Sequence, residues 1–377
     1  MPRFLKILPA FAVMLAMICA PMLAGSATAR AQDASPAASP ISCEPTARAA
    51  TEAVATVTPG AGSSPTGDLA KIKVGFVPVT VFAPIFVAKD LGYYAEEGLE
   101  VDLEPFPGGA DPVVLTASGE LDAAFVGVGP AFWNGASQGL PMKIIAPGHA
   151  EGDPVATPLM ISQKDCADGK ITSVADLKGK KVSVNARGAT EYWLNAALET
   201  GGLTIDDVDL QVLPFPDAVA ALQSGAVDAA MVGEPLATQA ERDGIAVRLA
   251  SSFAVQDIQP TTIIGNEQWL TEHPDQAEGF VTGYMRASKL LADGGLNDPA
   301  VQAIIEKYTG VPAELVAASV SPVYSADGFI AFDGLGKLQT FFRDRDQLEY
   351  DTDLDPTTLA DETFVMAAMA ELNPNSP

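Results

Sequence analysis

The chain has 377 residues, more than one small hydrophobic core requires, and this length suits two domains. Its 48 acidic residues outnumber its 22 basic ones, which gives a formal net charge of −26. A chain this acidic repels phosphate backbones and anionic lipid surfaces, so nucleic acid is excluded as an expected partner, and any anionic ligand must be held by local donors.

Residues 1–31 have the pattern of a secretory signal peptide. Arg3 and Lys6 precede an apolar run over residues 7–23, and small residues then lead to a predicted cleavage point after Ala31. Cleavage there would remove three basic residues and leave the mature chain with a net charge of −29. We therefore expect a secreted protein that is periplasmic or held at the cell surface.

Two alternatives concern the same segment. It could be kept as an uncleaved membrane anchor, although Pro9 and Pro21 disfavour a continuous spanning helix. Lipid attachment at Cys19 is disfavoured because residues 16–18 do not resemble the usual lipidation motif.

Residues 32–68 are rich in Ala, Ser, Thr, Pro and Gly, which predicts a disordered linker. Cys43 in this linker and Cys166 are the cysteines left after the predicted cleavage. In an oxidising compartment they could form a disulfide, and two unlinked thiols are the equal alternative. The only histidines, His149 and His273, stand far apart in the sequence, so we expect no metal site and no cofactor.

One sequence pattern occurs twice, 106 residues apart. Residues 118–127 read SGELDAAFVG, and residues 224–233 read SGAVDAAMVG. Each copy follows a helical run and ends in an apolar strand, which predicts two lobes of like topology. The alternative is that a short helix, a turn and a strand recur by chance in an α/β protein. Asp122 and Asp228 are expected to have structural roles at the strand starts.

The first lobe alternates strands and helices, which predicts a parallel sheet with its ligand site at the carboxyl ends of the strands. The loops over residues 80–83, 108–111 and 127–130 would then share one edge. In chain order we expect strands over residues 71–79, 99–106, 123–127 and 142–146, and helices opened by Pro84, following Asp111, and over 131–138.

The second lobe repeats this plan with strands over residues 181–184, 208–213 and 227–232 and helices after residue 190 and over 217–223. We expect the chain to cross between lobes near residues 161–171 and 256–262, with 261–265 returning to the first sheet. The predicted organisation is lobe one over 69–165, lobe two over 166–256, a largely helical return to lobe one over 257–350, and an acidic C-terminal extension over 351–377 with helix near 360–372.

A family resemblance becomes visible in these segments. Residues 73–101, with Ala-Pro at 83–84 and Leu-Gly-Tyr-Tyr-Ala-Glu-Glu-Gly-Leu at 91–99, resemble the opening of the periplasmic substrate-binding proteins of ABC importers for nitrate, sulfonates, taurine and pyrimidine precursors (the NMT1/THI5-like family). Residues 176–182 look like the start of that family's second lobe, and residues 224–235 resemble its second signature. The resemblance implies a type II periplasmic-binding-protein fold, with two α/β lobes and a ligand cleft between them.

The loop over residues 187–190 precedes a predicted helix, and free N–H groups at a helix start form a natural anion site. Arg187 would add a charged fork and Thr190 a hydroxyl. The alternative is that Thr190 only caps the helix and Arg187 is a solvated charge. The resemblance favours binding for the loop backbone and Thr190, and both interpretations of Arg187 stay open.

Aromatic side chains near the cleft would stack on a flat ligand. We expect this of Phe82, which lies in a cleft-edge loop, and ordinary core roles for Trp133, Trp193 and Phe215. Glu234 follows a strand and would face the cleft, where a buried carboxylate favours an amine, a ring N–H or a hydroxyl. The equal alternative for Glu234 is an exposed residue or a structural ion pair.

The resemblance thus implies the solute-binding component of an ABC importer, which is not an enzyme. It would capture a sulfonate, taurine-like or pyrimidine-type ligand by lobe closure and deliver it, as a monomer, to membrane permease subunits. A secreted ligand sensor is the alternative, and a pyrimidine-synthase-like enzyme is disfavoured because the chain has no Cys-rich stretch. The predicted ligand-binding residues are Thr80, Phe82, Gly109, Asp111, Gly129, Arg187, Gly188, Thr190 and Glu234.

Overall fold

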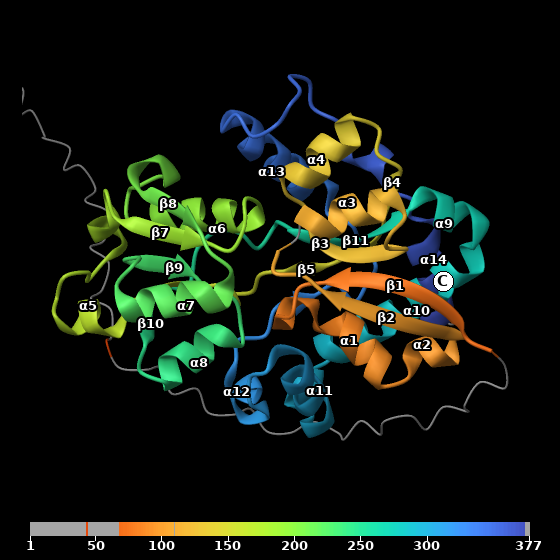
Figure 1. Ribbon diagram of the computed structural model, residues 1–377, viewed down its shortest axis with the longest axis horizontal. Helices are drawn as coiled ribbons and strands as arrows, with labels where there is room; N and C mark the ends of the chain where they lie inside the picture. Colours follow the sequence, from red (N-terminus) through yellow and green to blue (C-terminus); the bar gives the residue numbers. More distant parts are fainter. Residues whose placement is uncertain (1–42, 44–67, 109, 374–377) are drawn as a thin grey trace, which may run out of the picture. The chain divides into compact units, whose positions relative to one another are not determined.

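The computed structural model describes residue 43, residues 68–108 and residues 110–373 (Figure 1). The predicted signal peptide, nearly all of the predicted linker, Gly109 and residues 374–377 lie outside the described residues. In the part of the chain that is described, no helix combines the length and the apolar character needed to cross a membrane.

The first lobe is built on a five-stranded sheet in the order β2-β1-β3-β11-β4. The first three of these strands are parallel, as predicted, while β11 runs antiparallel to both β3 and β4. The strands are β1 (Ala70–Phe76), β2 (Leu99–Pro105), β3 (Ala123–Gly127), β4 (Met142–Pro147) and β11 (Thr261–Asn266), and the helices before the first crossing are α1 (Ala83–Asp90), α2 (Tyr93–Glu96), α3 (Ala110–Ser118) and α4 (Pro130–Ser137).

The second lobe has a sheet in the order β8-β7-β9-β6-β10, which matches the first sheet position by position. Strands β7, β8 and β9 are parallel, and β6 takes the antiparallel place that β11 takes in the first sheet. The elements are β6 (Leu159–Ser162), α5 (Gln163–Ala167), β7 (Lys181–Val184), α6 (Ala189–Glu199), β8 (Asp209–Val212), α7 (Phe215–Ser224), β9 (Ala229–Met231), α8 (Leu236–Arg242) and β10 (Ala246–Ala250). The predicted α/β fold with two lobes of like topology is confirmed.

The repeated sequence pattern has a physical cause in both sheets. The Asp122 carboxylate accepts a hydrogen bond from the Lys73 backbone N–H at 2.8 Å, which ties the start of β3 to β1. Asp228 does the same for the Lys181 N–H at 2.9 Å, which ties β9 to β7. Each aspartate therefore fixes the strand register in its lobe, and the predicted structural role is confirmed.

The helices after β11 pack mainly on the first lobe. The longest, α10 (Pro274–Ala292), contacts α1, α2 and α14, and its Tyr284 hydroxyl donates to the Pro147 carbonyl at the end of β4 at 2.7 Å. The others are α9 (Glu267–Glu272), α11 (Pro299–Thr309), α12 (Ala313–Ala318), α13 (Phe332–Asp344) and α14 (Thr363–Leu372). The predicted helix near residues 360–372 corresponds to α14.

Residues 351–373 are integrated with lobe one, in contrast to the predicted acidic extension. Val365 and Ala368 of α14 are buried against this lobe, and the Asp361 N–H donates to the Ile144 carbonyl at 2.8 Å. The apolar face of α14 explains the difference, because it has enough hydrophobic surface to pack.

The first crossing between the lobes lies earlier than predicted. Because β6 belongs to the second sheet, the chain crosses over residues 148–158, ahead of residues 161–171 and of the predicted lobe boundary at residue 165. Within this crossing, β5 (His149–Ala150) pairs with β12 (Val323–Tyr324), so a third segment also lies between the lobes. The second crossing precedes β11, which returns to the first sheet as predicted.

The two crossing segments are bound to each other. Gly148 N–H donates to the Thr261 carbonyl at 3.1 Å, and His149 N–H donates to the Thr261 hydroxyl oxygen at 3.1 Å. A Cβ at position 148 would come within 2.2 Å of that hydroxyl, so this close approach requires glycine. The contact fixes where the side chains after Gly148 emerge between the lobes.

A disulfide joins Cys43 to Cys166, which settles the two alternatives left by the sequence. Cys166 lies in α5 and is buried. The bridge ties the chain before lobe one to lobe two across a sequence separation of 123 residues.

Candidate functional site

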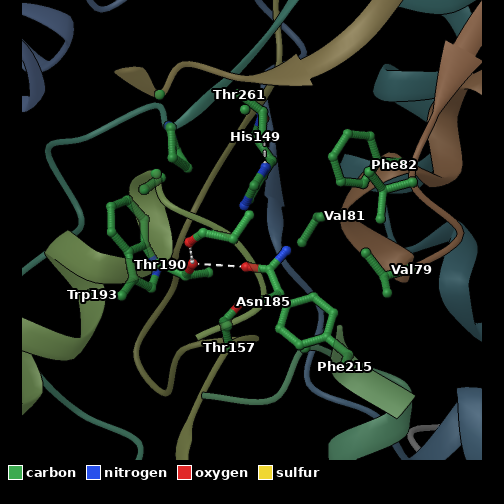
Figure 2. A pocket seen from close by; sticks show the side chains of 18 of the residues that line it. Val79, Val81, Phe82, His149, Thr157, Asn185, Thr190, Trp193, Phe215 and Thr261 are labelled. Atoms are coloured by element: carbon green, nitrogen blue, oxygen red, sulfur yellow. Dashed lines mark hydrogen bonds between the residues drawn. The ribbon is translucent and has the colours of Figure 1, made fainter. Parts of the chain in front are cut away.

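A cavity of about 100 Å³ lies between the lobes (Figure 2). One ordered water requires roughly 10–15 Å³ by the same measure, so this space admits a small molecule. Lobe one contributes Val77, Val79, Val81, Phe82, Ala110, Gly127, Gly129 and Ala131, lobe two contributes residues 185–190, Trp193, Phe215 and Gly233, and the crossings with the start of β11 contribute His149, Glu151, Thr157, Pro260 and Thr261.

The cavity lies where the carboxyl ends of the parallel strands of both sheets meet. Val77 follows β1, and Gly127 ends β3. On the other side, Asn185 follows β7, and Gly233 comes shortly after β9. This is the position predicted from the α/β pattern, because loops at that edge are free to shape a site.

The loop before α6 lines the cavity, but its polar side chains are engaged within the protein. The Thr190 hydroxyl donates to Asn185 Oδ1 at 2.7 Å, so its proton is used and only its lone pairs face a ligand. The half-exposed Arg187 pairs with the fully buried carboxylate of Glu191, which also accepts from Gln347 Nε2 at 2.7 Å. The Thr190 proton is therefore not available to a ligand, and the charge of Arg187, whose role the sequence left open, is paired within the protein.

Two predicted glycines face each other across the cleft. A Cβ on Gly129, at the start of α4, would come within 3.1 Å of Gly188 Cα and 3.2 Å of the Arg187 carbonyl oxygen. Gly188 is the N-cap of α6, so two helix starts from different lobes make contact here. Both glycines line the cavity.

The aromatic lining is larger than predicted. Phe82 lines the cavity and packs on Phe125 with ring centroids 4.6 Å apart. Trp193 and Phe215, for which we expected ordinary core roles, also line it from lobe two (Figure 2). Trp133 is fully buried in the core and does not line the cavity, as expected.

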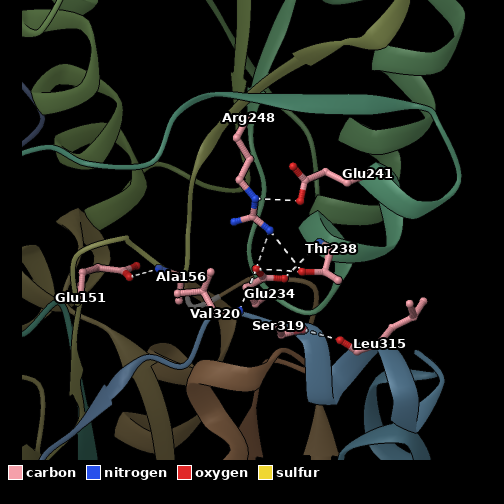
Figure 3. Close-up of polar contacts among 9 residues, drawn as sticks. All are labelled: Glu151, Ala156, Glu234, Thr238, Glu241, Arg248, Leu315, Ser319 and Val320. Carbon is pink, nitrogen blue, oxygen red and sulfur yellow. Dashed lines mark hydrogen bonds and ion pairs between the residues drawn. The ribbon is translucent and has the colours of Figure 1, made fainter. Parts of the chain in front are cut away.

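Glu234 does not face the cavity, which corrects its predicted role (Figure 3). Its fully buried carboxylate accepts from Arg248 Nη2 at 2.7 Å, from the Thr238 N–H at 3.1 Å and from the Val320 N–H at 3.1 Å. The preceding Gly233 lines the cavity, and the chain then turns the glutamate towards Arg248. The structural ion pair, which was the alternative, is what the structure contains.

Two other predicted residues, Thr80 and Asp111, do not line the cavity. Thr80 is buried beside the crossing, where its N–H donates to the Glu234 carbonyl at 3.0 Å and its carbonyl accepts from the Tyr324 hydroxyl at 2.8 Å. Asp111 is exposed on α3, one residue beyond Ala110, which does line the cavity. Gly109 lies outside the described residues.

Glu151 is a cavity residue that the sequence analysis missed. It is 2% exposed, and its carboxylate accepts from Trp193 Nε1 at 3.0 Å and from the Ala156 N–H at 2.5 Å. Burial raises the pKa of this carboxyl above its ordinary value, while the hydrogen bonds from Thr157, Ala156 and Trp193 act in the opposite direction. Within the described residues, no basic side chain forms an ion pair with it.

His149 is a second cavity residue that the sequence analysis missed. Like Glu151, it belongs to the first crossing, which was predicted too late in the chain. Its Nδ1 lies 2.7 Å from Thr261 Oγ1 and its side chain is buried. Burial lowers the pKa of this imidazole to about 3, so the ring is neutral at neutral pH. In the described part of the chain, no group of three His, Cys, Asp or Glu side chains is placed to hold a metal ion.

Known proteins resemble both the sequence and the fold. The nitrate/nitrite binding protein NrtA of Nostoc sp. PCC 7120 is 25% identical over 245 residues, covering 61% of this chain and 56% of NrtA. The riboflavin-binding protein RibY of Chloroflexus aurantiacus is 28% identical over 244 residues, covering 62% of this chain and 65% of RibY. The match thus spans less than two thirds of either relative's length.

A solved structure shares the two-lobed arrangement. The alkanesulfonate-binding protein SsuA from Xanthomonas axonopodis pv. citri, bound to MOPS, aligns with a TM-score of 0.64 at 17% identity, covering 79% of this chain and all of SsuA. A model of the NMT1-like family matches residues 66–306, more than half of the chain. The chain therefore belongs to the NMT1-like family, and its architecture is that of the periplasmic binding proteins.

Proposed function

We propose that this protein is the solute-binding component of an ABC importer, which encloses a small organic molecule between its lobes and delivers it to membrane permease subunits. The observation that carries the proposal is the cavity at the meeting carboxyl ends of two sheets of like topology. The names of NrtA, RibY and SsuA support a binding role. The ligands in these names differ: nitrate or nitrite, riboflavin and alkanesulfonate. The ligand of this chain therefore depends on the residues that line its own cavity.

Lobe closure would be the working motion. The lobes are joined by short segments that are bound to one another at Gly148, His149 and Thr261, which suits a hinge whose rigid halves rotate. The contact between the two helix starts at Gly129 and Gly188 would belong to the closed state and would be lost as the lobes open. A permease would then distinguish the closed, loaded protein from the open one.

The predicted site of action follows from the same proposal. A solute-binding component works outside the cytoplasmic membrane, which agrees with the signal-peptide pattern over residues 1–31 and with the Cys43–Cys166 disulfide. We expect a monomer, because each chain holds a complete cavity.

Gly129→Ala should weaken ligand binding by roughly 5- to 150-fold, since overpacking typically costs about 1–3 kcal/mol. Its Cβ would press on backbone atoms of residues 187 and 188 at 3.1–3.2 Å, which cannot move aside as a flexible side chain can. Calorimetric titration with the molecule released from the purified protein measures the effect.

The matched comparison is Gly188→Ala, whose Cβ would lie 3.8 Å from Gly129 Cα, an ordinary contact. It should weaken binding less than Gly129→Ala does. Equal losses in the two variants, or no loss in either, would show that the lobes do not meet here in the bound state.

The proposed function is tested by native mass spectrometry of the mature protein isolated from its own host. We expect one small molecule per chain. Ala186→Trp places a large ring at the cavity and should abolish this adduct, because Ala186 lines the cavity from a loop. An adduct that survives in Ala186→Trp would place the binding site elsewhere, and the absence of any adduct and of any import defect in a deletion strain would contradict the function.

A further inference from the structure

We propose that the cavity takes a planar molecule that is neutral or cationic and donates an N–H hydrogen bond to the buried carboxylate of Glu151, in preference to an anion. This inference rests on the proposed function and specifies the ligand class of the same site. It moves the ligand-facing carboxylate from Glu234, where the sequence placed it, to a residue of the first crossing.

Glu151 is the buried acidic side chain of the cavity lining. Its carboxylate has about four lone-pair positions, and the Ala156 N–H, the Trp193 Nε1–H and the Thr157 side chain occupy three of them. A buried carboxylate is costly unless a cation or further donors compensate it. No basic side chain among the described residues pairs with Glu151, and Glu151 lines the cavity, so a ligand is in position to supply the remaining hydrogen bond and any compensating positive charge.

Glu234 shows by contrast what a fully compensated glutamate looks like in this protein. It is as deeply buried as Glu151, but Arg248 and two backbone N–H groups satisfy it (Figure 3). The difference between the two glutamates is the guanidinium. Glu234 has the Arg248 guanidinium as a partner, whereas Glu151, which borders the cavity, has no basic partner among the described residues.

The described lining has no positively charged side chain that is free of an acidic partner. Arg187 is the only Lys or Arg among these residues, and the buried Glu191 neutralises it. His149 is buried and its neighbour is the Thr261 hydroxyl, a partner without charge. An anion in this space would meet the Glu151 carboxylate without an unengaged cation to offset it.

The rest of the lining fits a flat molecule with both donors and acceptors. Trp193, Phe215 and Phe82 offer ring surfaces. Asn185 accepts from Thr190 through Oδ1, so its Nδ2 is the donor end, and no described residue receives a hydrogen bond from it. Glu151 would accept an N–H of the ligand while Asn185 donates to a ring nitrogen or a carbonyl.

The test compares probes of matched shape and opposite charge on the mature protein after its bound molecules are removed. Benzamidinium and benzoate are the planar pair, acetamidinium and acetate repeat the comparison at smaller size, and nitrate and methanesulfonate represent simple anions. Calorimetric titration should give benzamidinium or acetamidinium at least a tenfold advantage over its matched anion. Tighter binding of any anion, or no binding by either amidinium, would overturn the proposal.

Glu151→Gln keeps the shape and removes the charge. It should lower amidinium affinity at least tenfold and leave the matched carboxylate unchanged or improved. Glu199→Gln is the control, because Glu199 lies on the same helix as Trp193 but outside the cavity, bonded to Asn195. A purely structural Glu151 would lower both affinities equally, and that outcome would contradict the proposal.

The wild-type comparison does not depend on whether the variant folds. It also separates this inference from the proposed function. If nitrate or methanesulfonate binds and is enclosed, the importer role holds and only the ligand class is wrong. If no molecule copurifies with the protein and none of the probes binds, both fail.

Discussion

Arg248→Met should lower the free energy of unfolding by about 3–5 kcal/mol, the usual cost of removing one partner from a buried ion pair. The Arg248 side chain is 7% exposed and pairs with Glu234 at 2.7 Å and with Glu241 at 2.8 Å. Methionine fills similar volume but leaves two carboxylates of low exposure without this cation. Urea unfolding at neutral pH measures the loss.

Lys71→Met is the matched control, because Lys71 and Glu100 form a pair whose side chains are 77% and 55% exposed. It should change stability by at most about 1 kcal/mol. If Arg248→Met cost no more than this control, the ion pairs of Arg248 would not be significant for stability, and the structural assignment of Glu234 would lose its basis.

Loss of the Cys43–Cys166 disulfide should lower the free energy of unfolding by up to about 4–5 kcal/mol. The bridge spans 123 residues, and in the chain-entropy account a long closed loop restricts the unfolded chain most. The double variant Cys43→Ser, Cys166→Ser should show this loss in denaturant unfolding.

Reductant supplies the control for the disulfide. It should destabilise the wild-type protein towards the level of the double variant and leave the double variant unchanged. Identical unfolding curves for the wild-type protein with and without reductant would mean that the bridge does not constrain the unfolded chain.

Much of the fold could be predicted because its signals are local. Short stretches of sequence are enough to predict the strands and helices of each lobe and the repeat that relates the lobes. Asp122 and Asp228, for example, make the same contact between neighbouring strands in the two sheets. Strand β6 was missed because Leu159–Ser162 is a short apolar run without alternation, and its place in the second sheet depends on partners distant in sequence.

The candidate site was harder to predict because side-chain direction and pairing are not local. The sequence placed Glu234 at a strand end, but its partner Arg248 lies in β10, which no pattern connected to it. Thr190 lines the cavity, as its place in the loop before α6 suggested. Its hydroxyl proton, however, is used in the hydrogen bond to Asn185. Glu151 was overlooked because the crossing that carries it was expected after residue 160.

Small-angle scattering shows whether the lobes close around a small molecule. The mature protein should be measured after removal of its bound molecule and again during titration with that molecule, identified by mass spectrometry. We predict that the radius of gyration falls as the lobes close and that the change saturates at one molecule per chain. A scattering profile that stays constant through saturation would contradict closure around a ligand.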